Sequence, residues 1–145
     1  MNQSSLFRFA GWSAYVSAAA TIFGFVTLIT FFMVGEPFGT MNDVSSIVIV
    51  LAAIPILFSL YQYNRPASPT GSLIALIVGV LGALSAAIFA IISITTRRTY
   101  GDSVSLSYGV FGLSLVMYSY LALTDKVLPV DWPGLVLSLG SATFW

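Results

Sequence analysis

The chain contains no cysteine and no histidine among its 145 residues. Without cysteine it has no disulfide, no thiolate nucleophile and no cysteine-ligated zinc or iron–sulfur site. Without histidine it lacks the usual axial ligand of haem, an imidazole ligand for a chlorophyll magnesium and the commonest general base. These two absences exclude most cofactor-bound and catalytic classes of membrane protein.

Charge is also scarce. Charged residues make up 7% of the chain, against about a quarter in soluble domains. Four runs carry none at all, and each is long enough to cross a bilayer: 9–35, 44–64, 66–96 and 103–124. The composition is 58% hydrophobic, with a mean hydropathy of +0.98. We therefore predict an all-α integral membrane helical bundle, with the charges confined to loops and ends.

The whole chain, 1–145, is predicted to form a single transmembrane domain. We place its spans at about 11–34, 44–61, 72–95 and 104–123. A further apolar segment at 134–145 is too short for a straight span. It is either interfacial, re-entrant or the start of a fifth helix, and we expect the natural chain to continue past Trp145. The first run is about twice as long as the apolar part of a signal peptide, so we interpret it as a span.

Residues 35–43 combine two glycines, a proline and an Asn-Asp pair, which predicts a turn-rich loop. Asp43 is then the expected N-cap of the second span. Within that span Pro55 removes one backbone hydrogen bond and crowds the carbonyl of Leu51, so we expect a kink there. The proline-rich stretch 61–71 is interpreted as a tight connection between helices.

The distribution of basic residues gives an orientation. Arg8, Arg65 and Lys126 fall on one side of the membrane, whereas Arg97 and Arg98 fall on the other. The positive-inside rule then places the N-terminus in the cytoplasm. With no eukaryotic targeting signal in the sequence, a prokaryotic inner membrane is the expected location.

The third span carries the most specific pattern in the chain, two rows of small residues. Small residues four apart allow close backbone approach between helices in lipid. We predict that these residues pack against other helices, within the bundle or in a second subunit. They are Ala75, Gly79, Gly82, Ala83, Ala86, Ala87 and Ala90.

Hydroxyl and aromatic residues form two weaker patterns. The hydroxyls are expected to bond to the carbonyl one turn back, although they also suit the lining of a polar path; they include Ser13, Ser17 and Thr21, and Ser103, Ser105, Ser107, Ser114 and Ser119. The aromatic residues of the fourth span suit packing in the core or, alternatively, stacking on a quinone or pigment; they are Tyr108, Phe111, Tyr118 and Tyr120.

No arrangement typical of an enzyme is present. The plausible acid–base groups are Glu36, Asp43 and Asp102, which we place in loops without a His, Cys or paired Lys partner. No metal cluster, phosphate-binding glycine motif or basic patch for nucleic acid occurs in the sequence. We predict no catalytic residue, no metal site and no cofactor, and a bound lipid, quinone or pigment is left open.

Two features resemble bacterial multi-pass membrane proteins of unknown function. One is the stretch 35–43 before an apolar helix, and the other is the Leu128-Pro129 step into the apolar residues 134–137. The resemblance implies about six helices, each long enough to cross a bilayer. It carries over no functional residues, and it implies further helices after Trp145.

Small loops, spans free of charge and the ridge of small residues favour a noncatalytic role. We expect a structural or accessory subunit of a larger membrane complex, which could be energy-transducing, with bilayer lipids and other membrane subunits as its partners. The alternative is a transporter or channel for a small neutral solute, with Pro55 as the kink and the serines as the lining.

Overall fold

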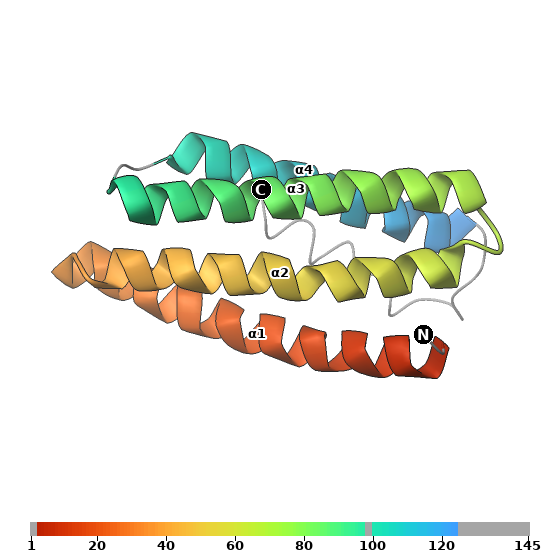
Figure 1. Ribbon diagram of the computed structural model, residues 1–145, viewed down its shortest axis with the longest axis horizontal. Coiled ribbons are helices and arrows are strands. Elements are labelled where there is room, and N and C mark those ends of the chain that lie inside the picture. Colours follow the sequence, from red (N-terminus) through yellow and green to blue (C-terminus); the bar gives the residue numbers. More distant parts are fainter. Residues whose placement is uncertain (1–2, 98–99, 125–145) are drawn as a thin grey trace.

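The structure is a computed structural model, which describes residues 3–97 and 100–124. This part of the chain forms four antiparallel helices and no strand. Figure 1 shows them as long rods joined by short turns. They are α1 (Gln3–Val34), α2 (Phe38–Asn64), α3 (Pro69–Thr96) and α4 (Gly101–Thr124). The predicted apolar segment at 134–145 lies outside the described residues.

All four helices are long and apolar enough to cross a membrane, which confirms the predicted fold class. Each extends beyond the predicted span by three to eight residues at its start. The longest, α1, has 32 residues and a length of about 48 Å, which exceeds the hydrocarbon thickness of about 30 Å. The extra turns of α1 lie at its start and include Arg8.

The connection between α1 and α2 is shorter than predicted, and Asp43 is not an N-cap. Gly35 ends α1 with a φ of +88°, which a residue without a Cβ adopts readily. Pro37 occupies the N-cap position of α2, and helix begins at Phe38. The Glu36 carboxylate accepts hydrogen bonds from the backbone N–H and the hydroxyl of Thr40, at 3.3 and 3.1 Å. Glu36 therefore satisfies one of the free N–H groups in the first turn of α2, and the side chain that caps this helix lies seven residues before Asp43.

The connection between α2 and α3 is tight, as predicted. Asn64 ends α2, and its carbonyl accepts the backbone N–H groups of Ala67 and Ser68 at 3.2 and 2.9 Å. Pro69 follows as the first residue of α3, where its missing N–H costs no helical bond. At the opposite end Arg97 closes α3 in the left-handed conformation.

The helices are arranged in series rather than as a closed bundle. In the described residues α2 contacts α1 on one side and α3 on the other, α3 contacts α4, and α2 touches α4 only lightly (Figure 1). Among the four described helices, α2 is the one whose backbone that of α1 approaches. Only 11% of the residues in the spanning stretch of α1 are buried, against 44% in α3 and in α4. The first helix is therefore peripheral.

The seam between α1 and α2 uses small residues of α1. Its buried positions are Ala10, Ser13, Gly24 and Thr27. They are separated by three, eleven and three residues, which places them on one face of the helix. A Cβ on Gly24 would lie 2.5 Å from the hydroxyl oxygen of Ser45 on α2. Close approach of the two backbones therefore depends on Gly24.

Candidate functional site

All seven residues of the small-residue ridge on α3 are buried inside the structure. A Cβ on Gly82 would lie 2.5 Å from the backbone nitrogen of Phe111 on α4. A Cβ on Gly79 would meet the side chains of Leu57 on α2 and Ser114 on α4. Helices of this same chain therefore occupy the ridge at Gly79 and Gly82, where it serves to bring α2, α3 and α4 together. The seven residues are Ala75, Gly79, Gly82, Ala83, Ala86, Ala87 and Ala90.

The hydroxyls largely bond within their own helices. Thr21 donates to the carbonyl of Ser17 at 2.8 Å on α1. On α4 the hydroxyls of Ser107, Ser114 and Ser119 donate to carbonyls three or four residues earlier, at 2.8 to 2.9 Å. For these four residues the expected bond to the preceding turn is confirmed.

Two tyrosines of α4 join the helices through their hydroxyl groups. Tyr118 is fully buried, and its hydroxyl lies 3.1 Å from the carbonyl oxygen of Ser72 on α3 and 3.4 Å from that of Leu57 on α2. The hydroxyl of Tyr108 donates to the carbonyl of Ser46 on α2 at 3.2 Å. Tyr120, 65% exposed, faces away from both, so the aromatic residues of α4 form no common stacking surface.

The predicted acid–base candidates and the kink residue take separate positions. Asp43 lies inside α2, and Asp102 lies in the first turn of α4. The carboxylate of Glu36 accepts a hydrogen bond from the backbone N–H of Thr40. No group of three acidic residues that could hold a metal ion occurs in the described residues. The helix α2 continues through Pro55 as one element, so the kink stays a prediction.

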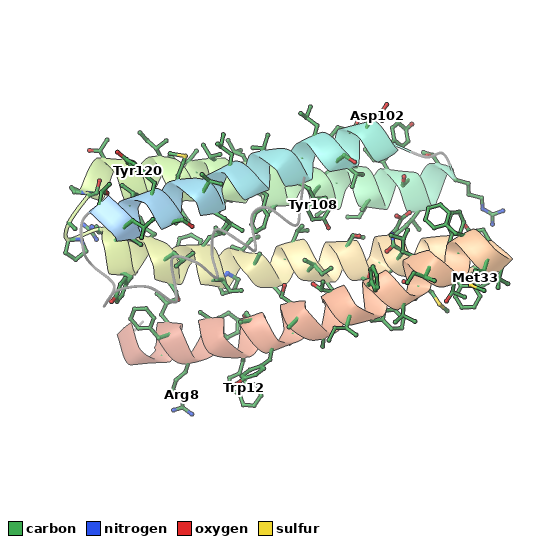
Figure 2. All side chains as sticks on the ribbon, turned by 180° about the vertical axis from the view of Figure 1, so that it is seen from behind. Arg8, Trp12, Met33, Asp102, Tyr108 and Tyr120 are labelled. Carbon is green, nitrogen blue, oxygen red and sulfur yellow. The ribbon has the colours of Figure 1, made fainter. Side chains whose placement is uncertain are left out.

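A second row of small residues lies on the outside of α1, and we call it the outer row: Gly11, Ala14, Ala18 and Thr21. Steps of three and four residues place them on one face of the helix. All four are exposed, and a Cβ on Gly11 would have no atom within 4 Å. Figure 2 shows the large neighbours Arg8 and Trp12 projecting from α1 away from the other helices. The outer row was missed from the sequence, although its spacing was visible there.

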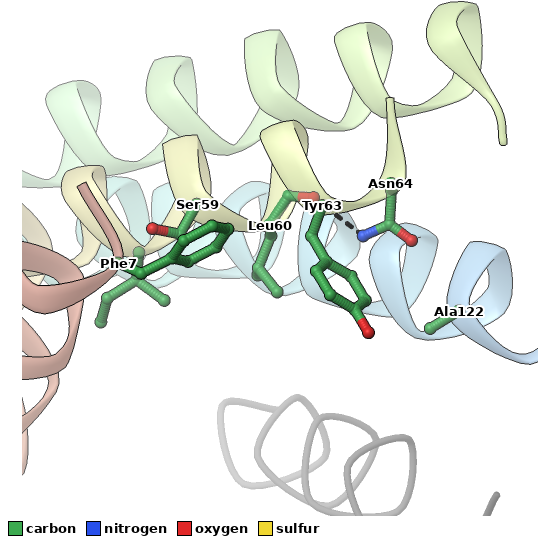
Figure 3. Close-up of a pocket in the computed structure, with 7 residues that line it drawn as sticks. Phe7, Ser59, Leu60, Tyr63, Asn64 and Ala122 are labelled. Atoms are coloured by element: carbon green, nitrogen blue, oxygen red, sulfur yellow. Dashed lines mark hydrogen bonds between the residues drawn. The ribbon is translucent and has the colours of Figure 1, made fainter. Parts of the chain in front are cut away.

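A pocket lies where the start of α1 meets the ends of α2 and α4, and we call it the end pocket (Figure 3). Its volume is about 330 Å³. The lining is mostly apolar and comes from three helices: Phe7 from α1, Ala122 from α4, and Ile56, Ser59, Leu60, Tyr63 and Asn64 from α2. Because Phe7 and Gly11 lie four residues apart on α1, the end pocket and the outer row share one side of that helix.

Two polar side chains in the end pocket are buried with incomplete hydrogen bonding. Asn64 is 2% exposed and Ser59 is 8% exposed. The amide nitrogen of Asn64 donates to the carbonyl of Leu60 at 2.8 Å, whereas its Oδ1 atom has no partner among residues 3–97 and 100–124. The Ser59 hydroxyl has no partner in this part of the chain either. A buried polar group without a partner costs about 1 to 3 kcal/mol, so these two atoms lower the stability of the packing at this end of α2.

Sequence reasoning missed both residues. Asn64 was interpreted as the polar end of an apolar run, and Ser59 was not singled out among the serines. A lone serine inside a strongly apolar span was the available signal. Its lack of a partner depends on how α1, α2 and α4 pack, which the sequence alone does not reveal.

Comparisons with protein-family models, with curated proteins and with solved structures found no match to this chain. The structure itself defines the class, an integral membrane protein built from helices long and apolar enough to span the bilayer.

Proposed function

We propose that this protein is a noncatalytic, structural or accessory subunit of a larger membrane complex, and that the outer row of α1 is its contact with a neighbouring subunit. The observation that carries the proposal is the exposure of Gly11, Ala14 and Ala18 on a helix that packs against α2 alone.

The exposed small residues of the outer row are covered in a membrane either by lipid or by another helix. Lipid chains are as apolar as leucine, so helices gain no hydrophobic stabilisation from leaving lipid. They associate where small residues permit close backbone contact. The inward seam of α1 already uses its small residues in this way, at Ala10, Ser13 and Gly24. The outer row offers the same chemistry on a second face, which suits a second helix.

The arrangement of the other helices supports the same role. The ridge of α3 packs inside the chain at Gly79 and Gly82, so α2, α3 and α4 form a self-contained unit with an apolar core. The hydroxyls of Ser107, Ser114 and Ser119 bond to their own helix. This use of the hydroxyls supports helix packing over the lining of a solute path.

Replacing Ala14 and Ala18 together by leucine should detach the protein from its complex while leaving the fold intact. Both side chains are exposed in the described part of the chain, so added bulk should disturb the fold little but separate α1 from a neighbouring helix. The measurement is extraction from the native membrane in a mild detergent, then native electrophoresis with mass spectrometry. The wild type should migrate with larger partners in fixed stoichiometry, and the variant as the free chain.

Ala19→Leu is the matched control, because Ala19 is also exposed but lies about 100° further round the helix, off the outer row. It should migrate like the wild type. Recovery of the wild type as a lone monomer or a small homo-oligomer would overturn the proposal. So would equal effects of the variant and its control.

A further inference from the structure

We propose that the first turns of the apolar segment 134–145 pack into the end pocket. The segment follows α4 through a connector of nine residues, 125–133, and both lie outside the described residues. Three features of the molecule support this docking: the apolar lining of the pocket, the place where α4 ends, and the composition of the connector and the segment.

The end pocket presents an apolar surface that three helices share. Phe7 of α1, Ala122 of α4 and residues of α2 line it, and almost none of the lining surface is polar (Figure 3). On α2 the positions Ile56, Leu60 and Tyr63 are four and three residues apart, so they form one stripe about 10 Å long. An unfilled apolar hollow loses dispersion contacts along its walls. The pocket therefore favours an occupant made of hydrocarbon side chains and about two helical turns long.

The end of α4 places the connector beside this pocket. Ala122 lies two residues before Thr124, the last residue of α4, so the connector leaves the helix about 3 Å beyond the pocket wall. The connector contains the charged residues Asp125, Lys126 and Asp131, which favour the membrane surface. Nine residues reach at most about 30 Å. The apolar segment therefore begins at the end of the bundle where the pocket lies, whether it is interfacial, re-entrant or the start of a fifth helix.

The side chains of the segment suit the pocket. The segment 134–145 has no charged residue, and four large aliphatic residues lie near its start: Leu135, Val136, Leu137 and Leu139. Backbone groups inside the hydrocarbon region have to be hydrogen-bonded within a helix, so we expect a helix with Leu135 and Leu139 on one face. The pocket volume of about 330 Å³ is at the lower limit for small-molecule sites. It suits these two side chains better than a whole lipid.

The inference is independent of the proposed function, because the end pocket and the outer row lie at different depths. Gly24 of α1 meets Ser45 of α2 across the antiparallel seam. Ten residues further toward the pocket along each helix, Ala14 is level with Pro55. The lining of the pocket starts beyond this depth, at Ile56. Ala14 and the deeper members of the outer row therefore remain open to a neighbouring subunit when the pocket is filled.

Disulfide formation in double-cysteine variants tests the docking, because the chain has no cysteine of its own. Phe7→Cys is combined with Leu135→Cys or with Leu139→Cys in the purified full-length protein, and the variants are oxidised in lipid nanodiscs. Phe9→Cys replaces Phe7→Cys in the matched control, since Phe9 is also exposed but lies about 160° away round α1. At least one pair with position 7 should form an intrachain disulfide in about tenfold higher yield than the same pair with position 9, measured by mass spectrometry after digestion.

Three results would overturn the proposal. Equal yields from positions 7 and 9 would mean that the segment has no fixed place on the bundle. Disulfides that join two chains would assign the pocket to a second copy of the protein. Absence of any disulfide, in variants whose helical content by circular dichroism matches the wild type, would leave the pocket to lipid.

A second measurement needs no cysteine. Leu139→Asn should lower the melting temperature of the purified protein by about 5 °C, because it puts an amide into the apolar pocket. Leu137→Asn is the matched control, since a helix places Leu137 about 160° away from Leu139. It should melt within about 1 °C of the wild type. Equal effects of the two substitutions would contradict docking through one face of the segment.

Discussion

Gly82→Ala should lower the free energy of unfolding in detergent by about 3 kcal/mol, although it adds a single carbon. That carbon would lie 2.5 Å from the backbone nitrogen of Phe111 and 2.9 Å from its Cα atom. A backbone cannot swing aside as a flexible side chain does, so α4 as a whole would have to move away from α3. The measurement is unfolding by titration of the micelles with a denaturing detergent.

Gly11→Ala is the control for this substitution. Gly11 is also helical, but a Cβ there would have no atom within 4 Å. Alanine is a better helix former than glycine by about 1 kcal/mol, so this variant should be as stable as the wild type or slightly more so. If Gly82→Ala were equally harmless, close packing of α3 on α4 would not be the main source of stability.

The second large effect is expected at Tyr118, the largest fully buried side chain in the described residues. Tyr118→Ala should lower the free energy of unfolding by about 4 kcal/mol, because it leaves a cavity where α2, α3 and α4 meet. The same denaturing-detergent titration measures it.

Tyr118→Phe separates the contribution of the ring to stability from that of its hydroxyl group. It keeps the packing but loses the hydrogen bond to the carbonyl of Ser72 or Leu57. The expected loss is about 1 kcal/mol, since side-chain hydrogen bonds between membrane helices are individually weak. An equal loss for the Phe and Ala variants would show that the hydroxyl, rather than the ring, joins the three helices.

The helices were predictable because the runs without charge mark them directly. Their boundaries were harder to predict, and the error at Asp43 shows why. Glycine, proline and asparagine residues at 35–43 indicated a long loop, yet Gly35 and Pro37 suffice to turn the chain. Glu36 accepts hydrogen bonds from Thr40 in the first turn, and helix forms from Phe38 onward despite the low helix propensities of Gly39 and Asn42.

The candidate site was less predictable than the fold. Regular spacing indicated that the ridge on α3 packs against other helices, and local geometry explains the hydroxyl bonds. Which helix faces which is a property of contacts far apart in sequence. In the described residues, the Oδ1 atom of Asn64 lacks a hydrogen-bond partner and the outer row is exposed. Both features depend on the packing of α1 against α2 rather than against α4. No local pattern encodes that arrangement.

The most direct test of the proposed subunit contact uses the absence of cysteine from the chain. Single cysteines are introduced by Ala18→Cys and by Ala19→Cys, labelled with a photo-crosslinker and activated in the intact native membrane. The account predicts that the label at position 18 links the chain to a different membrane protein in high yield, and that the label at position 19 reacts with lipid. Equal labelling of lipid from both positions, or crosslinks to further copies of this chain alone, would contradict it.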